Sequence, residues 1–186
     1  MIQSKADLKY YIAQDLATFA KELGNGKSKQ GGVKRWFRIR YNKLIYFHVI
    51  LRKYEYYVNV NNGFWGKLMK LYYQHKFSKL RYLLGISICP NCFGPGLHIA
   101  HFGSIAVYSE AKIGKNCVLH TATNIGNKNG APIIGDNVYI GPGAKIFGPI
   151  IIANGVKIGA NAVVNKSILE ENVSVAGVPA KIIKRN

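Results

Sequence analysis

Residues 107–164 read VYSEAKIGKNCVLHTATNIGNKNGAPIIGDNVYIGPGAKIFGPIIIANGVKIGANAVV, and in this stretch one apolar residue returns at every sixth position. Three extra residues interrupt the step once, between Ile125 and Ile134. The residues on the step are Val107, Ile113, Leu119, Ile125, Ile134, Ile140, Ile146, Ile152, Ile158 and Val164. A period of six matches neither the 3.6 of an α-helix nor the 2 of a strand, so it indicates an internal repeat.

The composition of each hexapeptide predicts a parallel β-helix of triangular section. Its second residue is often Gly, and its fifth is small or β-branched, as at Cys117 and Ala144. Each hexapeptide then supplies one short strand and one corner, and three make a coil. The first residue points inward, the fifth fills the remaining interior, and Gly or Asn takes corners that need unusual backbone angles. After Val164 we expect a looser final coil and then an exit loop with a basic tail, AGVPAKIIKRN (residues 176–186).

Length and cysteine content limit the class of protein. A chain of 186 residues can bury the core of one good-sized domain, and its three cysteines make a disulfide framework improbable. No signal-peptide pattern precedes residue 21, and the longest strongly apolar run, residues 44–51, is far short of a membrane span. We therefore expect a cytoplasmic protein.

The positive charge concentrates in the first half of the chain. Residues 1–85 hold 17 Lys and Arg against four Asp and Glu, a net +13, whereas the remainder carries +5. We expect a basic, aromatic-rich helical region over residues 1–84 and a β-helix domain over residues 85–186. The expected helices lie at residues 1–24, 33–57 and 65–85, with a flexible link at residues 24–32.

Two interpretations of the basic helices stay open. Their aromatic faces either pack against the repeat with the charges solvated, or they lie on an anionic membrane at the inner face of the cell membrane. Nucleic-acid binding is a weaker hypothesis, because no recognisable nucleic-acid module accompanies the charge.

Four segments of the second half carry a family resemblance: HFGSIAV (101–107), NVYIGPGAKIFG (137–148), IGANAVV (158–164) and AGVPAKII (176–183). Together with the repeat, they resemble the hexapeptide-repeat acyltransferases of the serine acetyltransferase type. The chain looks closer still to their relatives encoded with bacterial capsule and surface-polysaccharide genes. The resemblance covers about residues 85–184. It implies a left-handed parallel β-helix, a homotrimer, and acetyl-CoA in the groove between neighbouring subunits.

The resemblance also implies a catalytic base. Acyl transfer from a thioester requires a group that removes the proton of the attacking hydroxyl, and histidine suits this because it titrates near neutral pH. In GLHIAHFGSIAV (96–107) the family's base falls on His101. His98 has no family counterpart, so we expect it at the surface or in a subunit contact. The family's orienting carboxylate is replaced by Ser87, which leaves the partner of His101 open.

Counting hexapeptides predicts that a second histidine, His120, lies next to His101. The strands starting at Ile99 and Leu119 are three hexapeptides apart, with a two-residue bulge before Val107, so they lie on one face in successive coils. His101 and His120 should therefore be close neighbours. His120 either orients the acceptor or the thioester, or has a structural role facing solvent.

The resemblance assigns the cofactor contacts to corner residues. Gly126 and Asn127 should lie near the pantetheine or the acyl carbonyl, while the end of the chain should border the adenine, with Lys181 near a phosphate. The remaining residues carried over are Gly141, Pro142, Gly143, Gly159, Ala160, Ala176, Gly177 and Pro179. Gly and Ala at these corners are also what the coil itself needs, so the functional assignment competes with a purely structural one.

The acceptor is the point where the chain departs from serine acetyltransferases. Their charged contacts to the amino and carboxylate groups of serine fall here on Ala100, Gly130 and Ala131. Without charged partners a zwitterion is poorly discriminated. We therefore expect a sugar hydroxyl of a surface polysaccharide or its lipid-linked precursor as acceptor, with serine O-acetylation as the alternative. The insertion IGNKNGAPI (125–133) should protrude beside the acyl groove and set specificity.

Metal chemistry is a weaker alternative. Cys89, Cys92, His98 and His101 make a C-x2-C, H-x2-H pattern, but a lone C-x-x-C is a weak zinc signal and binding there would consume the base. A solenoid zinc enzyme of the carbonic anhydrase type needs three converging histidines, and a third has no good candidate beside His101 and His120. We expect no metal. A non-catalytic scaffold remains a further alternative.

Overall fold

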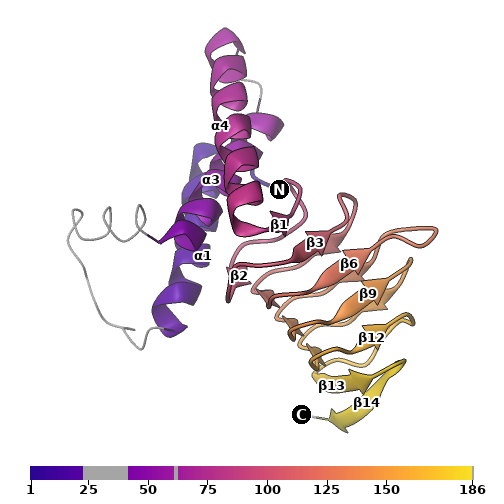
Figure 1. Cartoon of the computed structure of the whole chain (residues 1–186). Helices are drawn as coiled ribbons and strands as arrows, with labels where there is room; N and C mark the ends of the chain where they lie inside the picture. Colours follow the sequence, from indigo (N-terminus) through magenta and orange to yellow (C-terminus); the bar gives the residue numbers. More distant parts are fainter. Residues whose placement is uncertain (23–41, 61–62, 186) are drawn as a thin grey trace.

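The computed structural model describes residues 1–22, 42–60 and 63–185. In it, short parallel strands of the second half stack into a β-helix, and three helices cover one end of the stack (Figure 1). The expected link at residues 24–32 and the expected helical residues 33–41 lie outside the described residues.

The strands form three sheets, one for each face of the prism. Sheet A contains β1 (Ile86–Ser87), β3 (Ile105–Val107), β6 (Asn124–Gly126), β9 (Lys145–Phe147) and β12 (Val163–Val164). Sheet B contains β4 (Lys112–Ile113), β7 (Ile133–Ile134) and β10 (Ile151–Ile152). Sheet C contains β2 (His98–Ile99), β5 (Val118–Leu119), β8 (Tyr139–Ile140), β11 (Lys157–Ile158), β13 (Val173–Gly177) and β14 (Ala180–Arg185).

The period-six residues form the interior, as the sequence predicts. All ten, from Val107 to Val164, are at most 5% exposed. Fifth-position residues such as Cys117 and Ala144 are fully buried beside them, and burial raises the pKa of the Cys117 thiol to about 12. Hydrophobic burial along the prism axis is therefore what holds successive coils together.

Asparagine and glycine occupy the corners of the coils for different physical reasons. Asn116, Asn137 and Asn161 adopt positive φ near 55–58°, the left-handed conformation that the sequence predicts for corner asparagines. Gly141 has an ordinary φ, but a Cβ there would lie 2.8 Å from the Ile158 carbonyl oxygen of the next coil. This second-position glycine is required by the close approach of the coils and not by an unusual backbone angle.

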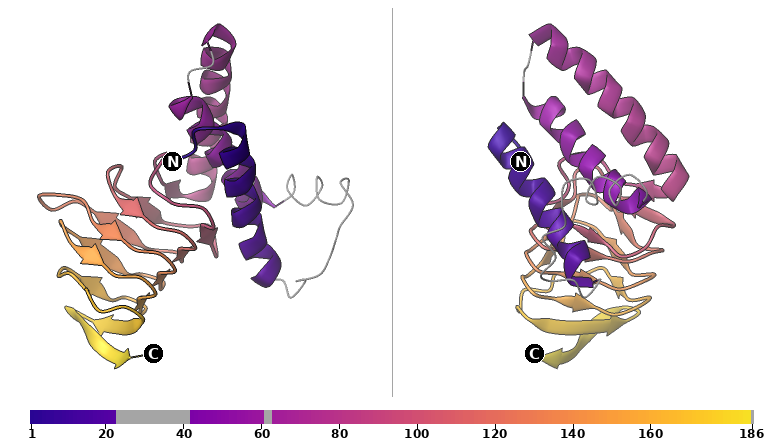
Figure 2. Two further views of the ribbon diagram at one scale, coloured as in Figure 1. Left: turned by 180° about the vertical axis from the view of Figure 1, so that it is seen from behind. Right: turned by 90° about the vertical axis from the view of Figure 1, so that its left-hand side faces the viewer.

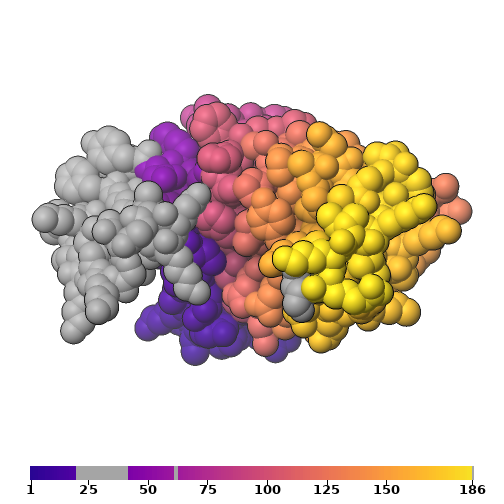
Figure 3. Space-filling model, turned by 90° about the horizontal axis from the view of Figure 1, so that it is seen from below, coloured from indigo at the N-terminus to yellow at the C-terminus, as the bar shows by residue number. Residues whose placement is uncertain are grey.

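The chain ends in a hairpin, which corrects the expected exit loop. β13 continues sheet C in parallel with β11, and β14 then returns antiparallel to β13. β13 ends at Gly177, which has a φ of +98°. The hairpin lies over the last coil, nearest the viewer when the molecule is seen from below (Figure 3).

The helices among the described residues are α1 (Lys5–Glu22), α3 (Lys43–Asn59) and α4 (Gly63–Leu84). α1 begins where the Ser4 hydroxyl accepts from Asp7 N, and α3 begins where Asn42 Oδ1 accepts from Leu44 N and Ile45 N. α1 packs against α3 and β2, and α4 packs against α3 and β1 (Figure 2). The apolar faces of α3 and α4 join the core of the β-helix in one continuous cluster.

Part of the aromatic surface is buried and part is exposed. Phe47 of α3 stacks on Phe77 of α4 at a centroid distance of 5.5 Å, as the packing hypothesis predicts. Phe64, Trp65 and Leu71, near the start of α4, are 62–74% exposed. That end of α4 lies away from the β-helix (Figure 1). None of the described helices combines the length and apolarity that crossing a membrane requires.

A buried ionic cluster joins the helices to the first coil, and the expected solvated charge face of α3 is wrong at this point. Arg52 is fully buried, and its Nε lies 2.7 Å from Asp15 Oδ2. Its Nη1 lies 2.9 Å from Glu55 Oε2. The same guanidinium donates to the carbonyl oxygens of Phe93 and Gly94 at 3.0 and 2.7 Å. These bonds hold α1, α3 and the first coil together.

Both carboxylates of this cluster also accept hydrogen bonds from the backbone of the coil. Asp15 Oδ1 accepts from Gly96 N at 2.8 Å and from Leu97 N at 3.0 Å. Glu55 Oε1 accepts from Asn91 N at 2.8 Å. Each buried charge is therefore paired and hydrogen-bonded, the condition under which buried ions are tolerated.

The Asp15 carboxylate should make the stability depend on acid pH. Burial pushes its pKa up, but Arg52 and His48 outweigh burial and hold the pKa below the usual 3.8. The stabilisation is therefore present above pH 3.8 and is lost as the pH falls through the lower pKa of the folded state. We expect the urea midpoint to fall on acidification below pH 3.8, and to fall less steeply in Asp15→Asn. Equal slopes in both proteins would contradict this assignment.

Candidate active site

His101 and His120 meet at the edge where sheet C turns toward sheet A. β2 and β5 pair in parallel with Ile99 opposite Leu119, and Ala100 N donates to Leu119 O at 3.0 Å. The two imidazole rings that follow lie 6.4 Å apart between centroids, so the predicted proximity is confirmed. His101 is exposed and His120 is half-buried, which leaves the first free to reach a substrate.

Tyr139 extends this pair and was missed in the sequence. Its ring lies 5.1 Å from that of His120, and the side chain is 36% exposed. Tyr139 pairs with Val118 across β8 and β5, so counting one coil onward past the insertion would have found it. The Thr123 hydroxyl donates to the His120 carbonyl oxygen at 2.8 Å and fixes the backbone beneath.

The orienting partner of His101 is not Ser87 in this chain. Ser87 lies on β1, opposite Ala106, and its Oγ accepts from Arg81 Nη2 at 2.9 Å. Across residues 1–22, 42–60 and 63–185, the His101 ring makes no hydrogen bond. The imidazole is thus positioned by its corner of the backbone and by the neighbouring ring.

Small residues continue the histidine edge along the stack. Leu119, Ile140, Ile158 and Val175 are in parallel register, so the residues after them form one row. This row contains His120, Gly141, Gly159 and Ala176. Pro142, Gly143 and Ala160 follow at the same corners, with Pro142 and Ala160 exposed. The structure therefore gathers most of the residues proposed for the cofactor on one edge, beside the histidines.

The loop residues lie at a different corner. Gly126 ends β6, and Asn127, Gly130 and Ala131 follow in the loop that projects from that edge of sheet A (Figure 1). Asn127 Oδ1 accepts from Gly130 N at 2.9 Å, which closes the loop on itself. Gly126 is six residues along the chain from His120, up to about 20 Å in extended backbone. The strand β6 lies between His120 and the loop, so the histidine pair and the loop belong to different corners of the prism.

The last proposed cofactor contacts lie on the terminal hairpin. Gly177 ends β13, Pro179 lies in the turn that follows, and Lys181 on β14 pairs with Ala176 on β13. All three are exposed. They lie at the far end of the stack from the helices (Figure 1).

The cysteine and histidine pattern does not converge. Cys92 is buried with its Sγ near the carbonyl oxygens of Tyr108 and Ser109, and burial raises its pKa to about 11. His98 is 7% exposed beneath α1, with Nδ1 3.1 Å from Thr18 Oγ1, so the expected surface position is wrong. In the part of the chain that the structure describes, no three His, Cys, Asp or Glu side chains cluster as metal ligands would.

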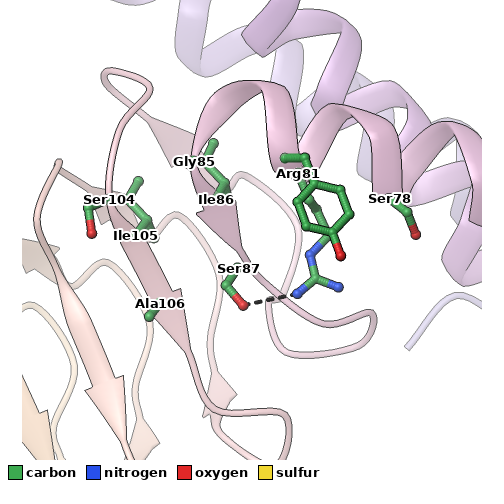
Figure 4. Close-up of a pocket in the computed structure, with 9 residues that line it drawn as sticks. Ser78, Arg81, Gly85, Ile86, Ser87, Ser104, Ile105 and Ala106 are labelled. Carbon is green, nitrogen blue, oxygen red and sulfur yellow. Dashed lines mark hydrogen bonds between the residues drawn. The ribbon is translucent and has the colours of Figure 1, made fainter.

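A cavity of about 480 Å³ lies where α4 meets the first coil (Figure 4). Arg81 and Tyr82 of α4 form one wall of the cavity. The other wall contains Ser87 of β1, Ala106 of β3 and Ser104, the residue that precedes β3. Sequence reasoning singled out only Ser87 among these residues, because nothing in a basic helix marks Arg81 apart from its neighbours.

Comparison with known proteins shows which proteins the repeat resembles. A family model described as bacterial transferase hexapeptide (six repeats) matches residues 131–166. This part of the chain is thus similar to the hexapeptide repeats of bacterial transferases. A serine acetyltransferase of Buchnera aphidicola is 40% identical over 116 residues, which cover 58% of this chain and 44% of the relative. One of Staphylococcus aureus strain Mu50 is 34% identical over 137 residues, covering 66% and 64%. The chain thus spans less than two thirds of either relative.

The fold of this hexapeptide-repeat protein is also that of solved serine acetyltransferases. A crystal structure of the Brucella abortus strain S19 enzyme in complex with coenzyme A superposes with a TM-score of 0.74 at 24% identity. The superposition covers 98% of this chain and 70% of the other. This likeness supports the left-handed parallel β-helix with a helical N-terminal region.

The expected sugar acceptor and the closeness to capsule and polysaccharide enzymes are corrected by these findings. The similar proteins are named serine acetyltransferases. The expectation rested on the uncharged Ala100, Gly130 and Ala131. Their lack of charge describes three positions only, and a charged group elsewhere on the chain can hold a zwitterion equally well.

Proposed function

We propose that this hexapeptide-repeat protein is an acetyl-CoA-dependent O-acetyltransferase that transfers the acetyl group to the hydroxyl of L-serine. The observation that carries the proposal is the exposed His101 beside His120, at the edge of a repeat whose relatives are named serine acetyltransferases. A coenzyme A complex of a protein with the same fold supports the choice of donor.

His101 is the general base in this proposal. Its imidazole takes the hydroxyl proton as the serine oxygen attacks the thioester carbonyl, and a tetrahedral oxyanion forms. The oxyanion requires a hydrogen-bond donor beside the thioester carbonyl. When the intermediate collapses, the C–S bond breaks and the imidazolium returns its proton to the departing thiolate. Acetylserine and coenzyme A are the products, and no other reactant is needed.

The row of small residues suits the extended pantetheine arm. Gly159 is half-buried and Ala160 is exposed, and both carry little or no side chain, so the pantetheine arm can lie close against this edge of the coils. Lys181 at the end of this edge is exposed and offers a cation to a phosphate. These assignments follow the family resemblance and the register of the coils.

We infer a homotrimer as the active form, because the histidine edge and the loop after β6 are separate corners of one chain. A neighbouring copy that brings its Asn127 loop to the His101 edge would complete the site. Sedimentation of the purified protein at about 62 kDa, three times 20.7 kDa, would support this assembly, and a monomer would contradict it.

We retain contact with an anionic membrane as a proposal for the helical end. α4 exposes Phe64 and Trp65 and carries five Lys or Arg with no Asp or Glu. Co-sedimentation of the protein with phosphatidylserine vesicles that is lost in Trp65→Ala would support this proposal. An equal amount of protein in the pellet with and without vesicles would contradict it.

The function is tested by an acceptor panel. We expect purified protein to release coenzyme A from acetyl-CoA when L-serine is present, with slower release for L-threonine and free monosaccharides, because serine is the acceptor named for the relatives. Thiol release is the measurement, and a reaction without acceptor is the control. Equal release with and without L-serine would contradict the proposal.

A further inference from the structure

The cavity at the junction of α4 and the first coil combines one cation with several hydroxyl groups. Arg81 enters it from the last turn of α4, and Ser78, Ser87 and Ser104 contribute hydroxyls. In Figure 4 the Arg81 guanidinium lies against Ser87 at the wall of the cavity. The volume of about 480 Å³ falls within the range of about 300–1,000 Å³ typical of small-molecule sites.

Arg81 has most of its hydrogen-bonding capacity free. A guanidinium carries five N–H donors, and here Nη2 donates to Ser87 Oγ at 2.9 Å. Its charged group also lies 5.6 Å from the centre of the Phe77 ring, which limits its movement. Among residues 1–22, 42–60 and 63–185, no carboxylate forms an ion pair with Arg81. A half-buried, oriented and unpaired arginine is a binding group for an oxyanion.

The cavity is tied to the histidine edge by a short piece of chain. Ser104 in its wall comes three residues after His101, so their Cα atoms are at most about 11 Å apart. This segment is anchored on the end of α4, since Gly103 N donates to Leu84 O at 2.9 Å and Ile105 N donates to Gly85 O at 3.1 Å. The segment that follows the base is therefore fixed against the end of α4, the helix that carries Arg81 in its last turn.

Resting on the function proposed above, we propose that Arg81 and its cavity bind the carboxylate of the acceptor amino acid. Serine needs a cation for its carboxylate, and Ala100, Gly130 and Ala131 supply none. Arg81 provides two parallel N–H groups that match a carboxylate, and the Ser87 hydroxyl beside the guanidinium is a further hydrogen-bonding group. The hydroxyl of the same molecule is then directed toward His101.

Substitution of Arg81 should act on the acceptor and spare the donor. In Arg81→Met we expect the KM for L-serine to rise by about 10- to 100-fold, the loss typical of a charged hydrogen-bonded pair, with the KM for acetyl-CoA unchanged. For serinamide, whose carboxylate is replaced by a neutral amide, the wild type and Arg81→Met should be alike. Arg81→Lys should recover only part of the loss, because an ammonium lacks the planar fork.

Lys79→Met is the matched control, because it removes the same charge from an exposed position of α4 that does not line the cavity. We expect its KM for L-serine to equal that of the wild type. If Arg81→Met and Lys79→Met have the same KM for L-serine, the inference is overturned. Circular dichroism of each variant verifies that the fold is retained.

A binding measurement separates this inference from the proposed function. If the wild type acetylates no L-serine, the function fails, but calorimetric titration with D-glycerate still tests the cavity, because glycerate has a carboxylate and hydroxyls without an amino group. Binding by the wild type that is lost in Arg81→Met supports the carboxylate site. Equal binding by both proteins, or binding by neither, overturns it.

Discussion

Replacing His101 by alanine is expected to lower kcat for acetyl transfer by about 10²- to 10⁴-fold, the usual contribution of a general base. The side chain is exposed at the corner after β2, so its removal leaves the core intact. The KM for acetyl-CoA should change little, since the imidazole acts on the acceptor hydroxyl. Steady-state kinetics of thiol release measures both constants.

His75→Ala is the control for the loss of a histidine, because His75 is exposed in the middle of α4. The kcat of His75→Ala should equal that of the wild type. The kcat of His120→Ala should lie between those of the wild type and His101→Ala, because His120 neighbours the base without being the base. A His101→Ala protein with full activity would exclude His101 as the base and move the chemistry to another residue.

The second large effect is on stability. Arg52→Met should lower the free energy of unfolding by about 3–5 kcal/mol, because it leaves the Asp15 and Glu55 carboxylates buried without their cation. Methionine keeps much of the side-chain volume, so the loss reports the charge and its hydrogen bonds more than a cavity. Urea unfolding followed by circular dichroism measures the change.

The Arg185–Glu170 pair provides the comparison. Its side chains are 73% and 43% exposed at an N–O distance of 2.7 Å, close to the separations in the buried cluster. Because solvent screens an exposed pair, Arg185→Met should cost less than about 1 kcal/mol. Equal losses for Arg52→Met and Arg185→Met would show that burial does not determine the contribution of the pair.

The repeat was predictable because its period is local. A hexapeptide step fixes which residues point inward, so the ten buried positions and the proximity of His101 to His120 followed from counting. The interruption after Ile125 located the projecting loop for the same reason.

The long-range partners were not predictable. Asp15 and Arg52 are separated by 37 residues, and in a basic, amphipathic half each looks like an ordinary solvated charge. The burial of His98 depends on α1 lying over β2, which no local pattern specifies. The same limit applies to Arg81, whose lack of a carboxylate partner within the described residues is a property of three-dimensional packing.

The acceptor was mispredicted because absent charges were given too much weight. Three uncharged positions led from serine to sugar, although a carboxylate can be recognised from another element of the fold. The similar proteins are instead named serine acetyltransferases.

The most direct test of the central claim is the product formed from acetyl-CoA and L-serine, identified by mass spectrometry with wild type and His101→Ala in parallel. We predict O-acetylserine from the wild type, in amounts equal to the coenzyme A released, and little or none from His101→Ala. A wild-type protein that forms no acetylserine, or a His101→Ala protein that forms it equally fast, would contradict the account.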